Sequence, residues 1–286
     1  MLYGKRIFWL ALSLSLLPGC ATQPQTETIA SKPSKSSKAN KAKRYLDIPM
    51  DTSVSSGIRF PKSSRTVDDV LNAFAPSAIG QLEPWFKKAG VAYPPNEIVL
   101  IAIKDEKKLE LWARDGGPFK LVKPYGIRAA SGMRGPKLKQ GDRQVPEGIY
   151  HISRLNPNSN YHLSMKVDYP NQFDRDHAID DGRNDLGGDI FIHGKAVSAG
   201  CLAMGDAAIE ELFVLSAQVG TENIRVIISP SDPRLRPLDT SHPSLPQWTT
   251  DLYDEITREI FSVTKAKPPI RLAHTGLHHP IYQPAN

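Results

Sequence analysis

The sequence predicts a mainly β domain with flanking helices, and three observations support this class. Short β-branched runs recur between residues 97 and 229, each bounded by Gly, Pro, Asn or Asp, which is typical of strands in a mostly antiparallel domain. Apolar residues at helical spacing mark the segments before and after this region. The chain shows no internal repeat, phosphate-binding glycine loop or dinucleotide fingerprint.

The N-terminus has the pattern of an export signal, which we expect over residues 1–19. Lys5 and Arg6 precede an apolar run that is too short to span a bilayer as a stable helix. Cys20 resembles a bacterial lipobox cysteine, which is lipidated and becomes the mature N-terminus, although Pro18 is unusual at that place. Two interpretations remain open: lipidation at Cys20, or an ordinary signal peptide cut nearby.

Residues 20–62 are predicted to be a flexible basic tether. Residues 21–44 carry almost no bulky apolar side chains, so they cannot form a core. Six bases and one acid lie between residues 20 and 44, whereas 28 bases face 29 acids from residue 45 onward. The net charge of +6 therefore belongs to the tether, which argues against a nucleic-acid partner.

The segment 63–96 is predicted to be a helical N-terminal extension. Its apolar residues repeat at helical spacing on both sides of Pro76, which favours two short helices. Strands are then predicted at 98–103, 109–113, 148–153, 161–167, 189–193 and 223–229.

Two further helices are predicted after these first strands. Asp206 is expected to cap a helix over 207–218 that stops at Gly220. Residues 230–286 read as a C-terminal extension, Pro-rich and irregular except for a helix around 248–263.

The segment from Asp189 to Asp206, DIFIHGKAVSAGCLAMGD, holds the residues with catalytic potential. A strand end can fix the His193 imidazole, and the intervening loop can fold back to bring Cys201 beside it, as a thiol nucleophile and its base require. Gly200 can adopt backbone angles that let nearby amides point at an oxyanion. Cys201 is predicted to be a free thiol, because the only other cysteine lies in the export signal.

Two blander interpretations compete with this one. A cysteine is more often an inert core residue than a nucleophile, and a histidine at a strand end is more often a satisfied polar group than a base.

The chain has eight histidines, but no H-E-x-x-H or similar ligand spacing, so we expect neither a metal nor a cofactor.

Several blocks in order resemble the YkuD-type L,D-transpeptidases, and more closely their YafK-like branch. They are GPKLKQGDRQVPEGIYHI from Gly135, LNPNSNYHLSMKVDYPNQFDR from Leu155, and the motif around His193 and Cys201. The resemblance covers residues 97–229 and implies a YkuD-like sandwich or barrel-like catalytic domain there. It further implies a catalytic triad, with Cys201 as the acylated nucleophile, His193 as the general base and the Gly194 carbonyl as the third member. Ser198 matches the hydroxyl position of the motif, and Gly200 matches the glycine before the cysteine.

The chain departs from the family at two positions. Ala199 replaces a usual histidine before the Gly-Cys pair, and Ala203 replaces a usual arginine, a carboxylate clamp, two residues beyond the cysteine. These losses put substrate choice in doubt. The family match offers Tyr161, Tyr169 and Asn171 as cleft residues, with core or cross-strand packing as the alternative. Separately, Arg128 and Lys195 are candidate contacts for a substrate carboxylate, and as exposed charges they could equally have no role.

The resemblance implies cysteine-dependent acyl transfer on peptidoglycan stem peptides. Two alternatives stay open: an amidase that releases a lipoprotein from the diaminopimelate of peptidoglycan, and an inactive envelope-binding lipoprotein on the same fold. The implied partners are peptidoglycan stem peptides, a peptidoglycan-linked lipoprotein and a membrane reached through the lipid anchor. The implied location is the periplasm, with the protein held as an outer-membrane lipoprotein.

Overall fold

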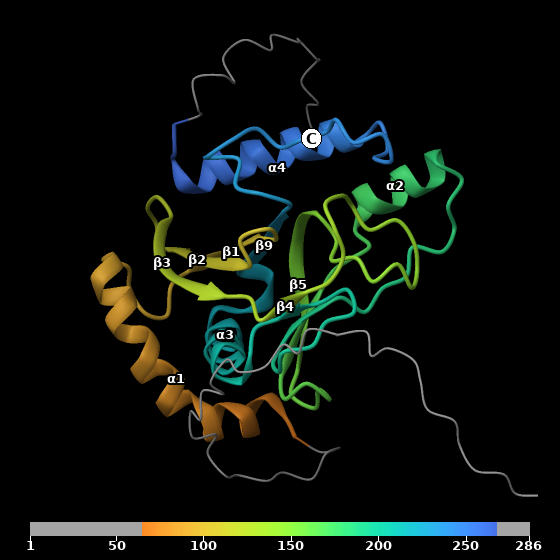
Figure 1. Ribbon diagram of the computed structural model, residues 1–286. Helices are drawn as coiled ribbons and strands as arrows, with labels where there is room; N and C mark the ends of the chain where they lie inside the picture. The colour runs from red at the N-terminus through yellow and green to blue at the C-terminus, as the bar shows by residue number, and fades with distance from the viewer. Residues whose placement is uncertain (1–64, 268–286) are drawn as a thin grey trace, which may run out of the picture. The chain divides into compact units, whose positions relative to one another are not determined.

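The computed structural model describes residues 65–267, which form a curved β-sheet with helices packed on it (Figure 1). The predicted export signal, Cys20, the predicted tether and the tail beyond residue 267 lie outside the described residues. The strands are β1 (Glu97–Ile103), β2 (Lys108–Arg114), β3 (Lys120–Gly126), β4 (Ala129–Ala130), β5 (Gly148–Asn156), β6 (Ser164–Val167), β7 (Phe191–His193), β8 (Leu202–Ala203) and β9 (Ile224–Ser229). The helices are α1 (Val67–Ala89), α2 (Gln172–Asp180), α3 (Asp206–Val219), a 3-10 turn (Thr221–Asn223) and α4 (Thr249–Thr264).

Within this region the strand order is β3-β2-β1-β9-β5-β6-β7-β8-β4. The sheet is mostly antiparallel, as predicted, with parallel pairing only at β1–β9 and β7–β8. β5 joins the two halves, because its first part pairs with β9 and its second part with β6, with an irregularity between Ile152 and Arg154. The half-barrel sheet with flanking helices confirms the predicted fold class.

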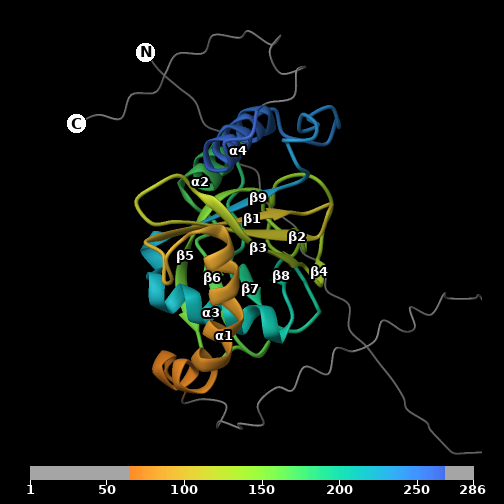
Figure 2. The same cartoon turned by 90° about the vertical axis from the view of Figure 1, so that its left-hand side faces the viewer.

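β1 and β9 form the centre of the sheet and are apolar on both faces. Successive β1 residues alternate between two buried clusters, so Leu100 faces one and Ile101 the other, as the two-residue period of a strand requires. α4 covers the second cluster with an apolar stripe that includes Ile256 and Ile260 (Figure 1). α3 and α1 cover the opposite face (Figure 2).

Two helix predictions are corrected. Residues 67–89 form the single helix α1 rather than two, and Pro76 lies inside it. Its start is fixed by a capping box, in which the Thr66 hydroxyl accepts from the Asp69 amide and the Asp69 carboxylate accepts from the Thr66 amide. Asp206 is the first residue of α3 and makes no cap, because Gly205 takes the N-cap position.

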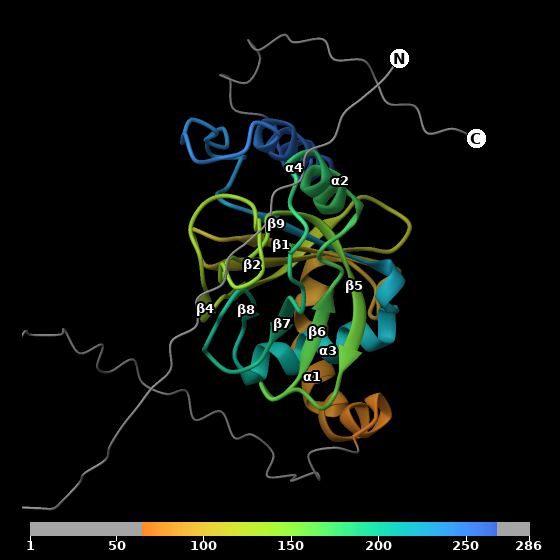
Figure 3. The ribbon, with the colours of Figure 1, turned by 90° about the vertical axis from the view of Figure 1, so that its right-hand side faces the viewer.

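Five elements escaped prediction: α2, β3, β4, β8 and the 3-10 turn over Thr221–Asn223. The predicted strand over 161–167 is also shorter, since β6 begins only at Ser164. Three of these differences, β4, β8 and the late start of β6, fall in the half of the sheet that contains β6, β7, β8 and β4 (Figure 3). No helix within residues 65–267 has both the length and the apolar composition to cross a membrane.

Candidate active site

His193 ends β7 and is held on both sides by neighbouring strands. It pairs with Ser164 of β6 and with Ala203 of β8. Only 2% of the residue is exposed. Its backbone carbonyl accepts from the Met204 amide at 2.8 Å, which fixes the strand end beyond the ladder. The imidazole therefore projects from a rigid and buried position.

The imidazole tautomer follows from its backbone partner. Nδ1 lies 2.6 Å from the Gly194 carbonyl oxygen, which can only accept, so Nδ1 carries the proton and donates. Nε2 is then the unprotonated nitrogen, as a general base requires. Burial lowers the pKa of His193, and the bond to the Gly194 carbonyl opposes that shift. The ring is neutral at pH 7.

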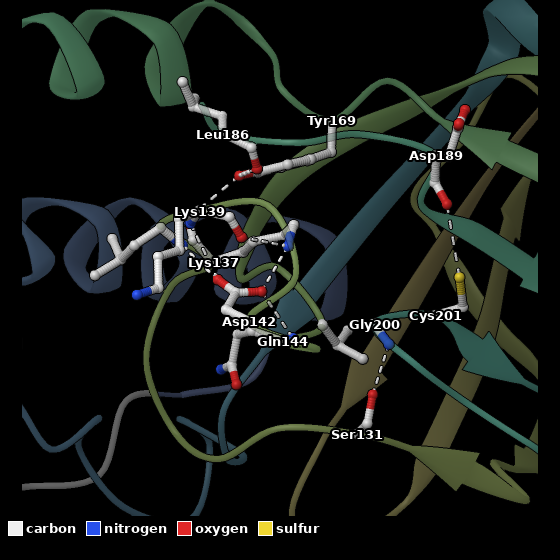
Figure 4. A network of polar contacts seen from close by, with 12 residues as sticks. Ser131, Lys137, Lys139, Asp142, Gln144, Tyr169, Leu186, Asp189, Gly200 and Cys201 are labelled. Carbon is white, nitrogen blue, oxygen red and sulfur yellow. Dashed lines mark hydrogen bonds and ion pairs between the residues drawn. The ribbon is translucent and has the colours of Figure 1, made fainter. Parts of the chain in front are cut away.

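Cys201 lies immediately before β8, next to the strand that carries the imidazole. His193 pairs with Ala203 of β8, two residues after Cys201, so the register brings Cys201 to the start of the strand next to the one that carries the imidazole. The thiol is free and partly exposed. The thiol donates to the Asp189 carbonyl oxygen, 3.7 Å from Sγ (Figure 4). No hydrogen bond among the described residues joins the thiol to His193.

The thiol is protonated at neutral pH in this state. Burial raises the pKa of Cys201, and the Asp189 carboxylate raises it further, while a backbone hydrogen bond from Phe191 and the charge of Lys137 lower it. With a neutral imidazole beside it, the resting site holds a thiol and a base rather than a thiolate–imidazolium pair. The thiol can then lose its proton to the base as it attacks.

Tyr161 covers the imidazole. Its ring stacks on the His193 ring with centroids 4.5 Å apart and planes tilted by 33°, while 43% of Tyr161 stays exposed. Among the residues predicted to bind substrate, Tyr161 is therefore in direct contact with the candidate base.

The loop after His193 is anchored by Asp206. The Asp206 carboxylate accepts from the Lys195 amide at 2.8 Å and from the Lys195 ammonium at 2.9 Å, which explains why it does not cap α3. Gly194 is packed closely, since a Cβ there would lie 2.6 Å from the Tyr161 carbonyl oxygen and 2.7 Å from the Asp206 carboxylate. The Lys195 ammonium, which is the group predicted to contact a substrate carboxylate, thus binds the Asp206 carboxylate.

Two serine hydroxyls hold the loop over residues 194–201, which is called the nucleophile loop after its candidate nucleophile Cys201. Figure 4 shows the contact of Ser131 with Gly200. The Ser198 hydroxyl donates to the Cys201 carbonyl at 2.7 Å and accepts from the Cys201 amide at 3.2 Å. The Gly200 amide donates to the Ser131 hydroxyl at 2.6 Å. The expectation that the amides near Cys201 point freely at an oxyanion is therefore corrected, because hydroxyl groups accept from both.

A polar clamp, formed by Lys137, Asp142 and Gln144, supports the other side of Gly200 (Figure 4). The buried Lys137 ammonium donates to Asp142 at 2.5 Å, and the Gln144 amide donates to the same carboxylate at 3.0 Å. A Cβ at Gly200 would lie 3.3 Å from the Gln144 carbonyl oxygen, and φ at Gly200 is +111°, so a glycine is required there. The clamp thereby holds the loop that contains Gln144 close to the loop that contains Gly200.

Comparison with known proteins identifies the domain that carries this site. Residues 96–228 match the family described as YkuD, the L,D-transpeptidase catalytic domain. This segment is a YkuD domain. Two sequence relatives, from Escherichia coli strain K12 and from strain O157:H7, both bear the name Putative L,D-transpeptidase YafK and are 38% identical over 140 residues. Each alignment covers 47% of this chain and 54% of the relative, so the chain spans about half the length of these relatives.

Solved structures resemble the chain more weakly. The helical cell shape determining protein Pgp2 from Campylobacter jejuni is 22% identical, with a TM-score of 0.40, over 53% of this chain and 56% of that one. L,D-transpeptidase 1 from Mycobacterium tuberculosis is 12% identical, with a TM-score of 0.28, over 46% of this chain and 61% of that one. Resemblance at these scores supports no functional argument.

Two predicted cleft residues of the YkuD domain have structural contacts instead. Tyr169 is 3% exposed, which differs from the expectation that it lines a cleft, and its hydroxyl donates to the carbonyls of Lys137 and Leu186 (Figure 4). Asn171 is the N-cap of α2, and its side-chain amide donates to the Ile149 carbonyl at 2.9 Å. Arg128 is exposed beside Gly205, and its amide donates to the Ala203 carbonyl, so its charge is available near β8.

Sequence reasoning missed Ser131 and the polar clamp. The clamp lies in the block GPKLKQGDRQVPEGIYHI, which is one of the blocks that resemble the YkuD-type family. No residue of this block was among the predicted site residues. Ser131 precedes that block and meets the nucleophile loop across a sequence separation of 67 residues to Ser198. The residues of the YkuD domain and its described flanks contain no cluster of three or more His, Cys, Asp or Glu side chains that could hold a metal ion.

Proposed function

We propose that the YkuD domain transfers the acyl group of a peptidoglycan stem peptide through a thioester on Cys201. The observation that carries this proposal is the hydrogen bond from His193 Nδ1 to the Gly194 carbonyl, which leaves Nε2 available as a base on the strand next to the one that follows Cys201. An inert histidine would need no such tautomer.

In the first half-reaction, the thiol turns from the Asp189 carbonyl toward Nε2, and Sγ attacks the amide carbonyl carbon while Nε2 takes its proton. The carbonyl π electrons move onto oxygen and form the tetrahedral oxyanion. When the C=O bond re-forms, the C–N bond breaks, and the imidazolium gives its proton to the leaving amine. The products are a thioester on Cys201 and a free amine.

In the second half-reaction, an acceptor attacks the thioester carbonyl, His193 takes the acceptor proton, and the C–S bond breaks. The imidazolium then returns the proton to the thiolate. An amine acceptor yields a new amide, whereas water yields a carboxylic acid. Transfer and hydrolysis, including release of an attached lipoprotein, therefore share one acyl-enzyme.

The experiment is product analysis by mass spectrometry after incubation with tetrapeptide muropeptides and with lipoprotein-linked muropeptides. We expect wild type to form a covalent adduct on Cys201 and to turn over at least one of these substrates. Cys201→Ala should form no adduct and no product. Turnover by Cys201→Ala, or no adduct on wild type with either substrate, would contradict the proposal.

We further propose that the protein acts in the periplasm, anchored to the outer membrane through a lipid on Cys20. The apolar run over residues 7–17 and the small residues before Cys20 support this placement. Membrane fractionation of wild type and Cys20→Ser is the test, with processing checked for sensitivity to globomycin. Soluble wild type, or processing that resists globomycin, would leave simple secretion as the correct interpretation.

A further inference from the structure

Ser131 lies next to the loop that leads into Cys201. β4 pairs antiparallel with β8, with Ala129 opposite Ala203 and Ala130 opposite Leu202, and Ser131 and Cys201 lie one residue beyond this pairing. The Ser198 hydroxyl oxygen accepts from the amides of both residues, and the Gly200 amide donates to the Ser131 hydroxyl. His193 ends β7, on the other side of β8. β8 therefore has the imidazole on one neighbouring strand and the Ser131 hydroxyl just beyond the end of the other.

The hydrogen-bonding capacity of Ser198 is already filled. A hydroxyl has one proton and two lone pairs. The Ser198 proton goes to the Cys201 carbonyl at 2.7 Å, because a carbonyl can only accept. The amides of Ser131 and Cys201 donate to the Ser198 oxygen, each at 3.2 Å. No lone pair of Ser198 remains for a third donor.

The proton of Ser131 consequently has no good acceptor in this cluster. The Ser131 oxygen accepts from the Gly200 amide at 2.6 Å, so its own hydrogen must point elsewhere. The neighbouring hydroxyl, Ser198, lies at 3.0 Å but is saturated. Ser131 thus has an unused hydrogen-bond donor close to Cys201. The hydrogen bond from the Gly200 amide polarises the Ser131 O–H group.

We propose that the Ser131 hydroxyl donates a hydrogen bond to the oxyanion that forms when Cys201 attacks its substrate. The proton stays on Ser131 throughout, and only the hydrogen bond forms and breaks. This inference rests on the proposed acyl transfer and deepens it, because it names the group that stabilises the charged intermediate. It also explains how the site can act while serine oxygens accept from the amides of Gly200 and Cys201.

The test compares two reactions of the same thiol. Acylation by a carbapenem passes through a tetrahedral oxyanion, whereas alkylation by iodoacetamide does not. Both rates are followed by intact-protein mass spectrometry on wild type, Ser131→Ala and Ser131→Thr. Ser153→Ala is the matched control, because that hydroxyl is exposed and donates only to the Lys166 carbonyl.

For Ser131→Ala we expect acylation to slow by about 10²-fold, the lower end for loss of an oxyanion donor, with the alkylation rate unchanged. Ser131→Thr keeps the hydroxyl and should acylate within a few-fold of wild type. Ser153→Ala should match wild type in both reactions. The unchanged alkylation rate also shows that the thiol and its loop remain folded.

Each other outcome is decisive. Equal acylation of wild type and Ser131→Ala would overturn the inference and leave the proposed function standing. A parallel fall in acylation and alkylation would show that Ser131 only positions the loop. If wild type itself is never acylated, the proposed function and the inference fail together.

Discussion

Two regions of the sheet differ in what holds them together. The first is the α4-covered layer, which consists of β1, β9 and α4 and is packed by apolar side chains on both faces of its strands. The second is the nucleophile edge, which consists of β7, β8, β4 and the loops between them. Its strands have only two or three residues, and hydroxyls, carboxylates and backbone groups fix its loops. The difference indicates that stability and chemistry are carried by separate parts of the fold.

The strongest test of this separation is His193→Gln. Removing the base should slow carbapenem acylation by about 10²- to 10⁴-fold. The melting temperature should stay close to that of wild type, because the apolar layer is untouched. The control is His151→Gln, an exposed side chain whose nearest acidic partner, Asp168, lies 3.6 Å away. Equal acylation by both variants would remove His193 from the mechanism.

The opposite behaviour is expected for Ile256→Ala in α4. The side chain is fully buried in the second apolar cluster, so its truncation should lower the free energy of unfolding by about 2–5 kcal/mol. Denaturant unfolding measures this loss. The acylation rate per folded molecule should not change, and a large fall in that rate at low temperature would show that the two regions are coupled.

The pH dependence of acylation sharpens the description of the nucleophile edge. Burial lowers the pKa of His193, so the rate should hold until below pH ~6.5 and then fall about tenfold per pH unit as the imidazole becomes protonated. Burial raises the pKa of Cys201, so iodoacetamide alkylation, which needs the thiolate, should still rise above pH ~8.5. Alkylation that is already maximal at pH 7 would indicate a preformed thiolate–imidazolium pair.

The smallest effect is expected for Asn171→Ala, which distinguishes a scaffold contact from a substrate contact. Loss of the α2 N-cap should lower the free energy of unfolding by about 1 kcal/mol. The Michaelis constant for a muropeptide substrate should be unchanged. A higher Michaelis constant with full stability would restore Asn171 to the substrate site.

The same two regions differ in how well the sequence predicts them. β1 and β9 are mostly apolar, and their predicted positions agree with the structure to within one residue. β3 was missed because only two of its seven residues are buried and it contains two lysines and a proline at the sheet edge. Pro76 predicts a break by local pattern, yet packing against the core keeps α1 continuous around it.

The candidate site could be predicted only where its residues lie close together in the chain. His193 and Cys201 share one short segment, so their strand and loop were found from local pattern. Ser131 reaches that segment only through the pairing of β4 with β8, two-residue strands that leave no periodic signal. Local pattern predicts Asp206 as a helix cap, because it does not show that the Lys195 amide and ammonium bind the Asp206 carboxylate.

The pairing of β9 has a consequence for how the protein is made. β9 is the last strand of the YkuD domain in the chain, yet it lies in the middle of the sheet, between β1 and β5. Until Ser229 has left the ribosome, β1 and β5 each expose an unpaired edge, and the sheet stays in two pieces. Folding of the sheet must therefore wait until the last strand of the domain has been made.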